Sequence, residues 1–526
     1  MAGQLADLAR ELGARGMLLG RLPVAEASAG LVVGGLAFDS RLVEPGDLFV
    51  AITGARQDGL EFAAEAVMRG AVAVVAEQVL DLNVPQLHVT ASRAVLAVAA
   101  AWLNGKPSHD LGVVGVTGTD GKTTTCFLTR SMLAACGLPA GMISTVTTFI
   151  GGQTAGHSRQ TTPESPVVQA VLRRMVDAGD RFAVIESTSH GLAMDRVAEV
   201  AFDVAVLTNV THEHLDLHGT IDAYVAAKRS LFEGLAAGDG NPDKGWPKSA
   251  VVNARDDHAL DFVEAARRAG ARLVTYSADR GLAATIHAQA IDVDGSHLNI
   301  RVSTPCWEDD VKVDLAGAFN ADNVLAAVGV GEALELDPQL MRAGIESVRA
   351  VPGRMDRIDA GQEFEVYVDF AHTSAALALV LDGLRPIAAR RGGGVIAVFG
   401  SSGERDVLKR PMMGRVAGER CCVAVLTNEE PRGEDEISIL EQIAVGAEQA
   451  GMQRDRELFL IPDRAAAIRK AFELARPTDI VVLAGKGHET TMEMAHGTLP
   501  WNEAEIARQT LKDMGYRGAL QGNPPR

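Results

Sequence analysis

The 526-residue chain has few cysteines, few aromatic residues and no long apolar run. Its 5 cysteines are scattered and form no Cys-x-x-Cys pair, which excludes a disulfide framework and argues against a structural zinc site. Aromatic residues make up 4% and the formal net charge is −18, so the chain lacks the basic surface and stacking rings of a general nucleic-acid binder. The longest apolar stretch, VLAVAAAWL, is about half of a membrane span.

The rest of the composition is that of an ordinary globular protein, with 47% hydrophobic and 22% charged residues. This length predicts about three or four domains. The first residues are not a signal peptide, because Asp7 and Glu11 interrupt them and leucines recur at helical spacing. We therefore expect a soluble, cytoplasmic monomer with no membrane or nucleic-acid partner.

Three segments with different patterns follow one another along the chain. In residues 1–107, strand-like and helix-like runs alternate up to a polar linker, NGKPSHD. In residues 108–350, apolar runs alternate with helical patterns, which predicts a parallel sheet wrapped by helices, and two alternating runs near residues 285–303 predict a small antiparallel addition. Residues 351–526 repeat the strand–helix alternation, which predicts a second doubly wound α/β unit.

The motif VVGVTGTDGKTTT at residues 113–125 predicts a phosphate-binding loop between a buried strand and a helix. Gly118 and Gly121 let backbone N–H groups close around phosphate oxygens, and Lys122 supplies a positive charge. Thr123 or Thr124 offers a hydroxyl to Mg²⁺. The motif is shorter than the full P-loop pattern, and the alternative is a tight turn with a surface lysine.

Acidic and histidine residues follow the next strands. The run FAVIESTSHG places Glu186 at a strand end, where its carboxylate can hold Mg²⁺ or simply be solvated. Residues 212–218 are dense in histidine and acid but contain no His-Glu-x-x-His, so a hydrogen-bonded loop is the commoner explanation. From helical spacing alone, Lys228 is a surface lysine.

Together these motifs resemble the Mur ligase family over essentially the whole chain. The matching segments occur in the family's order and spacing: TGTDGKTT, ESTSHGL, TNVTHEHLDLHG, AYVAAK, GAFNADNVLAA, VPGRM, VDFAHT, GERDVLKRPMM and AGKGHE. The N-terminal FDSRLVEPGDLFVAITG further resembles the branch that uses ATP to add a diamino acid to UDP-MurNAc-L-Ala-D-Glu in peptidoglycan synthesis. The resemblance implies an α/β fold in three domains: an N-terminal uridine-binding domain (1–107), a central P-loop ATPase domain (108–350) and a C-terminal Rossmann-like domain that binds the amino acid (351–526).

The resemblance also implies a role for each matching position. The catalytic residues would be Lys122, Glu186, His214 and Lys228. The ATP contacts would be Gly118, Thr119, Asp120, Gly121, Lys122, Thr123, Thr124, Asn320, Asn323 and Arg354. The Mg²⁺ ligands would be Thr123, Glu186, His214 and a carbamylated Lys228. The uridine diphosphate would meet Ser40, Ala55, Arg56 and Gln57, and the muramoyl-dipeptide would meet Gln160, Thr161, Thr162, Thr188 and Arg196. The incoming amino acid would meet Arg405, Glu429, Glu430, Arg432, Gly485 and Glu489.

The sequence departs from the family pattern where the amino acid is selected. Members that use meso-diaminopimelate commonly have D-N-P-R, where this chain has Glu429-Glu430-Pro431-Arg432. Arg432 suits a distal carboxylate, whereas Glu430 should repel one and favour the bare amine of lysine or ornithine. Because diaminopimelate is the commoner family substrate, we expect it ahead of the other two. Asp120 and Gln160 also replace the family's usual asparagines.

Four alternatives remain open. Two are other amide-forming ligases of the same fold, the D-Ala-D-Ala adding ligase and folylpolyglutamate synthetase; the QTTPES and GKGHE segments argue against the first, and the N-terminal domain against the second. The third is a catalytically inactive relative that only binds, which the retained Lys122, Glu186, His214 and Lys228 argue against. The fourth is a P-loop kinase, which would need no amine.

Overall fold

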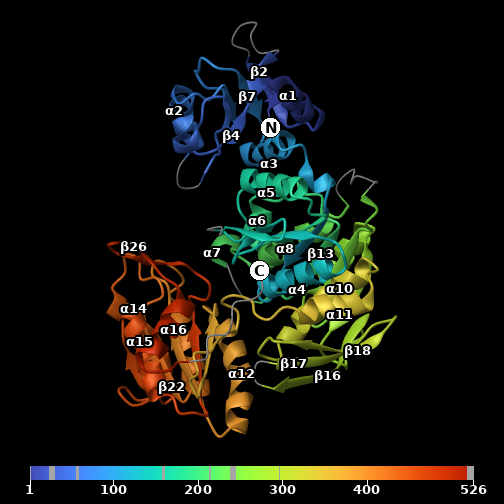
Figure 1. The fold of residues 1–526 in the computed structure, drawn as a ribbon. Helices are drawn as coiled ribbons and strands as arrows, with labels where there is room; N and C mark the ends of the chain where they lie inside the picture. Colours follow the sequence, from blue (N-terminus) through green and yellow to red (C-terminus); the bar gives the residue numbers. More distant parts are fainter. Residues whose placement is uncertain are drawn as a thin grey trace. The chain divides into compact units, whose positions relative to one another are not determined.

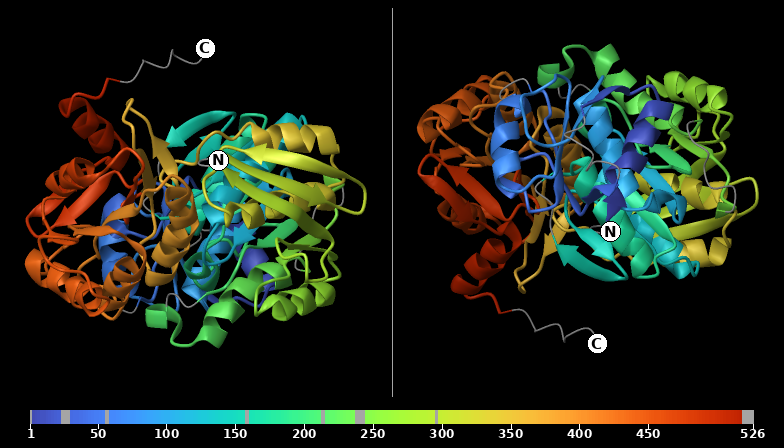
Figure 2. Two further views of the ribbon diagram at one scale, coloured as in Figure 1. Left: turned by 90° about the horizontal axis from the view of Figure 1, so that it is seen from below. Right: turned by 90° about the horizontal axis from the view of Figure 1, so that it is seen from above.

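The computed structural model describes residues 2–22, 30–54, 58–156, 160–211, 215–236, 244–294 and 297–517. The chain forms two compact units, Met1–Tyr276 with Ala326–Met341, and Ser277–Leu325 with Arg342–Arg526. The predicted alternation of strands and helices is confirmed in both (Figures 1 and 2). Within the described ranges, no helix has both the length and the apolarity needed to cross a membrane.

The first unit begins with a mixed five-stranded sheet in the order β2-β7-β6-β5-β4. All neighbours are parallel except β2 and β7. Alternate residues of β5 face opposite cores, since Leu48 and Val50 pack with α1 and α3 whereas Phe49 packs with α2. The elements are β2 (Leu18–Leu22), β4 (Gly35–Ala37), β5 (Asp47–Val50), β6 (Ala73–Ala76), β7 (Gln86–Val89), α1 (Leu5–Ala14), α2 (Ala63–Met68) and α3 (Ser92–Leu103).

The main sheet of the first unit has strand order β11-β10-β9-β12-β8-β13-β14-β15. The last six of these strands are parallel, and β10 and β11 form an antiparallel hairpin on β9 that the sequence patterns did not predict. Helices α5, α8 and α9 cover one face, and α4 packs against strands β8, β9 and β12. The strands are β8 (Gly112–Thr117), β9 (Ala140–Ile143), β10 (Thr148–Ile150), β11 (Gln153–Gly156), β12 (Phe182–Glu186), β13 (Val204–Leu207), β14 (Ser249–Asn253) and β15 (Arg272–Ser277). The helices are α4 (Lys122–Ala135), α5 (Ser165–Asp177), α6 (Ser189–Ala193), α7 (Leu215–His218), α8 (Ile221–Glu233) and α9 (Ala259–Arg268).

The second unit opens with the antiparallel addition predicted from the alternating runs, here three strands: β16 (Ile286–Asp294), β17 (His297–Ser303) and β18 (Glu308–Val313). Helices α10 (Asn320–Ala333) and α11 (Pro338–Glu346) have residues in both units.

A six-stranded sheet of order β19-β20-β24-β21-β22-β23 forms the rest of the second unit, parallel except at β19. In β21, Val395 and Phe399 face the core with α12, α13 and α14, whereas Ile396 and Val398 face α15 and α16. Its strands are β19 (Asp356–Ile358), β20 (Glu365–Asp369), β21 (Val395–Phe399), β22 (Val423–Leu426), β23 (Leu458–Leu460) and β24 (Ile480–Ala484). Its helices are α12 (Ser374–Arg390), α13 (Lys409–Arg420), α14 (Glu436–Gln449), α15 (Arg464–Leu474) and α16 (Glu503–Asp513), with a hairpin of β25 (Thr491–Met494) and β26 (Gly497–Pro500) before the last helix.

In both units, the loops at the carboxyl ends of parallel strands collect the polar residues that the sequence singled out. The predicted linker is more ordered than its composition suggested, because Pro107 and Ser108 are buried in a short 3₁₀ turn.

Candidate active site

The phosphate-loop motif joins the end of β8 to the start of α4, as predicted. Gly118 and Gly121 both have positive φ, +149° and +80°. A Cβ on Gly118 would lie 1.8 Å from Oγ1 of Thr208, so the site requires glycine. The loop is fastened to the end of β13: the N–H of Thr119 donates to the carbonyl of Asn209 at 2.7 Å, and the N–H of Asp120 donates to Asn209 Oδ1 at 2.9 Å. Asn209, which follows the neighbouring strand β13 and shapes the loop, carries no signal in the sequence that pointed to this role.

Lys122 lies over this loop. Its Nζ donates to the carbonyl oxygens of Gly118 at 3.1 Å and Thr119 at 2.6 Å. The positive end of the α4 dipole lies at the same place, because Lys122 is the first residue of the helix. The Lys122 ammonium, two positive-φ glycines and a helix N-terminus together fit a polyphosphate.

Glu186 ends β12 and is only 1% exposed. Its carboxylate accepts hydrogen bonds from the Thr123 hydroxyl, at 3.0 and 3.1 Å to its two oxygens, and from the N–H of Thr145 at 3.0 Å. The parallel pairing of β8 and β12 explains why these residues meet, since both strands end at the same edge. Thr145 belongs to none of the motifs that the sequence singled out.

Lys228 is 1% exposed, so the surface position expected from helical spacing is wrong. Its Nζ donates to the carbonyl oxygen of Gly118 at 2.5 Å and lies 4.3 Å from the ring centroid of Tyr224. The Tyr224 hydroxyl in turn lies 3.0 Å from Oγ1 of Thr119. Helix α8 therefore brings a buried amine directly to the phosphate loop.

His214, the remaining predicted metal ligand, lies outside the described residues. Among the residues that are described, no group of three or more His, Cys, Asp or Glu side chains is placed to hold a metal ion. The oxygen donors of Thr123 and Glu186 next to the loop are nevertheless of the hard type that Mg²⁺ prefers, since this cation usually takes one or two carboxylates together with phosphate oxygens and water.

The predicted muramoyl-dipeptide contacts lie beside Glu186. Oγ1 of Thr162 donates to the carbonyl oxygen of Glu186 at 2.7 Å and lies 3.0 Å from Oγ1 of Thr188. Arg196 donates to the carbonyl oxygen of Thr162 at 3.0 Å. Thr161 accepts a hydrogen bond of 2.9 Å from the hydroxyl of Thr145, the same residue whose N–H binds Glu186. One hydrogen-bonded network therefore joins these threonines to the end of β12.

The other predicted contacts of the first unit differ in burial. Ser40 is buried and donates to Glu65 at 3.0 Å, and Gln160 is exposed. Thr124 is buried in the first turn of α4. The predicted uridine loop, Ala55–Gln57, lies outside the described residues.

Three predicted nucleotide contacts lie in the second unit. Asn320 donates to the carbonyl oxygen of Ala316 at 2.7 Å, and Asn323 donates to Oδ1 of Asn320 at 2.8 Å. The Arg354 guanidinium stacks 4.5 Å from the ring centroid of Phe370.

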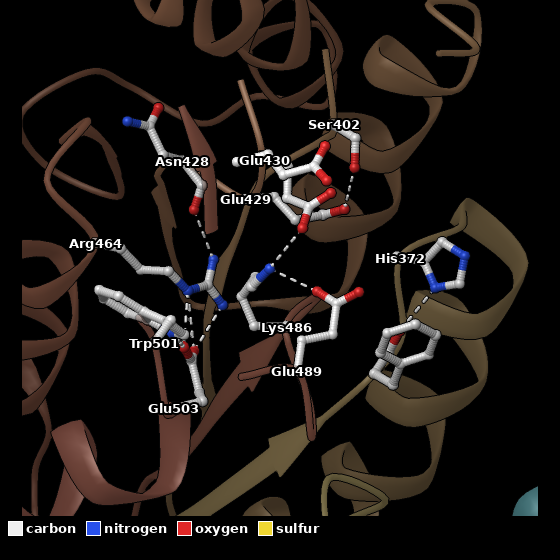
Figure 3. A network of polar contacts seen from close by, with 12 residues as sticks. His372, Ser402, Asn428, Glu429, Glu430, Arg464, Lys486, Glu489, Trp501 and Glu503 are labelled. Carbon is white, nitrogen blue, oxygen red and sulfur yellow. Dashed lines mark hydrogen bonds and ion pairs between the residues drawn. The ribbon is translucent and has the colours of Figure 1, made fainter. Parts of the chain in front are cut away.

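The second unit gathers charged residues at the carboxyl ends of β22 and β24 (Figure 3). Glu429 is 4% exposed, and its Oε1 accepts a 2.8 Å hydrogen bond from Ser402. Its Oε2 is buried with no hydrogen-bond partner among the described residues. Burial alone would raise the pKa of Glu429, but Lys409, His372 and the Ser402 hydrogen bond outweigh it and hold that pKa below its usual value.

Lys486 links the two loops of this cluster, and the sequence analysis did not single it out. It is fully buried, and its Nζ lies 3.1 Å from Glu430 and 2.5 Å from Glu489, as Figure 3 shows. Burial raises the pKa of Glu489, aided by the charges of Glu430 and Glu429, although Lys486 opposes the rise. The sequence did offer a signal for Lys486, because this residue lies inside AGKGHE between Gly485 and Glu489.

Arg432 has a left-handed backbone conformation and pairs with Glu430 at 3.2 Å and Glu493 at 2.9 Å. Gly485 has a φ of +104°, and a Cβ there would lie 2.8 Å from Oε2 of Glu429, so the two loops approach closely. Arg405 is exposed.

Comparisons with known proteins agree with this geometry. Three family models match the chain in order: the Mur ligase family catalytic domain at residues 32–104, the Mur ligase middle domain at 116–331 and the Mur ligase glutamate ligase domain at 353–487. The UDP-N-acetylmuramyl-tripeptide synthetase of Roseiflexus sp. (strain RS-1) is 45% identical over 92% of this chain and 96% of its own length. The UDP-N-acetylmuramoyl-L-alanyl-D-glutamate–2,6-diaminopimelate ligase of Solibacter usitatus is 40% identical over 94% of this chain and 96% of its own length.

A solved structure of a UDP-N-acetylmuramoyl-L-alanyl-D-glutamate–2,6-diaminopimelate ligase is 28% identical, with a TM-score of 0.63 over 92% of this chain and 95% of that one. The phosphate loop, the buried Glu186 and Lys228 beside it, and relatives matched over nearly their full length all lead to the same assignment. This chain belongs to the Mur ligase family and is an ATP-dependent peptide ligase.

Proposed function

We propose that this protein is a tripeptide synthetase that joins a diamino acid to the D-Glu carboxylate of UDP-MurNAc-L-Ala-D-Glu in peptidoglycan precursor synthesis. The observation that carries the proposal is the convergence of Lys122, Thr123, Glu186 and Lys228 on one phosphate loop. Relatives that carry tripeptide-synthetase and diaminopimelate-ligase names support the choice of substrate. We further propose that it acts as a cytoplasmic monomer on these small molecules.

The chemistry needs a carboxylate to be activated before an amine can displace its oxygen. One carboxylate oxygen of D-Glu attacks the γ-phosphorus of ATP, and ADP leaves. The amine nitrogen then attacks the carbonyl carbon of the acyl phosphate, inorganic phosphate leaves, and the nitrogen loses a proton. Lys122 and the Gly118–Gly121 loop hold and orient the transferring phosphate and stabilise its charge.

We assign Mg²⁺ to Thr123, Glu186, His214 and a carbamylated Lys228. Bound there, the cation would neutralise the charge that develops on phosphate oxygens. Lys228 Nζ already lies against the Gly118 carbonyl, so a carbamate on that nitrogen would bring an anionic group to the loop. The Thr161, Thr162, Thr188 and Arg196 network would position the dipeptide beside Glu186.

Residues 1–107 would bind the uridine diphosphate through Ser40 and the Ala55–Gln57 loop. Residues 108–350 would bind ATP, and the nucleotide would also be contacted by Asn320, Asn323 and Arg354. Residues 351–526 would bind the amino acid. Gln160 would meet the dipeptide, and Arg405 the amino acid. These assignments rest on the matching of motifs.

We propose meso-diaminopimelate as the added amino acid. Arg432 is retained, and Glu430 is paired with both Lys486 and Arg432, which reduces its repulsion of a distal carboxylate. A specific observation favours lysine or ornithine as the second candidate, because carboxylates outnumber cations at the loops. Residues 428–432 and 485–489 contain the carboxylates Glu429, Glu430 and Glu489 and the cations Arg432 and Lys486.

The test is phosphate release by the purified protein with ATP, Mg²⁺ and UDP-MurNAc-L-Ala-D-Glu. Separate reactions contain meso-diaminopimelate, L-lysine, L-ornithine or no amino acid, and product masses are measured. Stimulation by one amine with the matching product mass is the expected result. Absence of stimulation by all three would overturn the tripeptide-synthetase proposal, and stimulation by lysine or ornithine alone would overturn the choice of diaminopimelate.

A further inference from the structure

The second unit contains a fully buried ion pair behind the charged loops. The side chains of Arg464 and Glu503 are both 0% exposed. Nε of Arg464 lies 3.0 and 2.9 Å from the two carboxylate oxygens of Glu503, and its Nη2 lies 2.6 Å from one of them. The indole N–H of Trp501 donates to the other oxygen at 2.6 Å. The pair is therefore held by charge-assisted bonds on several sides.

The same guanidinium also reaches the carboxyl-terminal sides of two separate strands, β22 and β24. Nη1 donates to the carbonyl oxygen of Asn428 at 3.0 Å (Figure 3). Nη2 donates to the carbonyl oxygen of Ala484 at 2.8 Å. Asn428 immediately precedes Glu429, and Ala484 immediately precedes Gly485. One planar group with donors in a fixed geometry thus bridges the starts of both loops that we assign to the amino acid.

The spacing between these loops matters for the charged groups in front of them. Lys486, on the second loop, contacts Glu430 on the first at 3.1 Å. The carboxylate of Glu429 fills the space beside Gly485, where even a methyl group would lie 2.8 Å from Oε2. A small change in the separation of the two strand ends would therefore alter every contact across the cluster.

We propose that Arg464 and Glu503 are a positioning pair that sets the separation of the loops 428–432 and 485–489 and thereby the affinity for the incoming amino acid. Glu503 fixes the plane of the guanidinium, and the guanidinium fixes the two carbonyl groups. This proposal rests on the proposed function for the identity of the ligand, but its geometric part does not.

A purely stabilising role is the competing explanation, and buried ion pairs are weak evidence for it. Replacing such a pair by apolar residues of similar volume is often neutral or stabilising, whereas removing one partner is costly. The double variant Arg464→Met with Glu503→Leu therefore preserves the packing while it removes the bonds to both carbonyls. Arg464→Lys keeps the positive charge but lacks the planar guanidinium, whose nitrogens donate to both carbonyl groups.

The matched control lies on the same two helices. Arg469 of α15 and Asp513 of α16 form an exposed pair at 3.9 Å, with side chains 44% and 51% exposed. The double variant Arg469→Met with Asp513→Leu likewise replaces an arginine by methionine and an acidic residue by leucine, away from the loops.

The experiment measures KM for the diamino acid, ATP and UDP-MurNAc-L-Ala-D-Glu, thermal unfolding, and amide hydrogen exchange of the two loops in the protein without ligands. For the Arg464→Met, Glu503→Leu variant and for Arg464→Lys, we expect KM for the diamino acid to rise about tenfold or more, with the other two KM values little changed. We also expect faster exchange confined to residues 428–432 and 485–489, and no such changes in the control.

Unchanged exchange at these loops would overturn the proposal, whatever the activity. Faster exchange with lower thermal stability but an unchanged KM for the diamino acid would also overturn it, leaving only a stabilising role. If the unmodified protein accepts no diamino acid, the proposed function fails, and loop exchange still decides the geometric proposal.

Discussion

Glu186→Gln separates the electrostatic role of the buried carboxylate from its structural role. Glutamine has nearly the same volume and can still accept the hydrogen bonds that Thr123 and Thr145 now donate. The change removes a negative charge next to the phosphate loop and little else. We therefore expect a large loss of activity with a small loss of stability.

The expected magnitudes follow from the contacts. A hydrogen bond to a charged group contributes about 1.5–3 kcal/mol to the free energy of unfolding, and a neutral one about 0.5–1.5 kcal/mol. Making the bonds from the two donors neutral should therefore lower the free energy of unfolding by about 2 kcal/mol in total. Removing a buried charge relieves a desolvation cost that offsets part of this loss. Because we assign Glu186 to Mg²⁺, which would neutralise charge on the transferring phosphate, loss of its carboxylate should lower kcat by about 10²–10³-fold.

Glu77 supplies a matched control. It also accepts from one backbone N–H and one hydroxyl, both of Ser92, at 2.7 and 2.8 Å, but it directly follows β6 of the N-terminal sheet. Phosphate release dependent on the complete substrate set, together with calorimetric unfolding, is measured for Glu186→Gln and Glu77→Gln. The reasoning is refuted if Glu186→Gln keeps more than half of the activity, or if the two variants lose activity equally.

Three further predictions follow from single sites. Gly118→Ala should destabilise the protein by about 2 kcal/mol more than Gly137→Ala. Both glycines have positive φ, but only Gly118 has a neighbour within 4 Å of the added Cβ. Equal free energies of unfolding for the two variants would contradict this. The lowered pKa of Glu429 means that its ionised form stabilises the folded state above the unfolded pKa and that this contribution is lost as the pH falls through the lower folded value. Acid unfolding of Glu429→Gln, followed by circular dichroism, should therefore depend less on pH below about 4.3 than that of the unmodified protein, and parallel curves would be evidence against it. Burial raises the pKa of the Cys126 thiol well above its usual value, whereas Cys306 is exposed, so a thiol reagent at neutral pH should modify Cys306 in the native protein and Cys126 only after unfolding, as mass spectrometry can show.

The sequence by itself determined the class of fold and the location of the phosphate loop. The strand end predicted at Glu186 is confirmed, because fully buried parallel strands are near-continuous apolar runs that the sequence shows directly. The glycines and Lys122 could also be interpreted locally, since a phosphate loop is formed by residues close together in the chain. Short edge elements such as the β10–β11 hairpin were missed, because most of their residues are exposed or half-buried and carry little periodicity.

Only the tertiary structure decided which distant residues meet. Helical spacing predicted an exposed Lys228, but packing of α8 against the sheet buries it on the Gly118 carbonyl. Asn209 reaches the loop because β13 and β8 are neighbours, and Arg464 bridges Asn428 and Ala484 because β22 and β24 end at the same edge of their sheet. Such contacts depend on strand order and helix packing, which join residues far apart in the sequence and leave no local pattern in it.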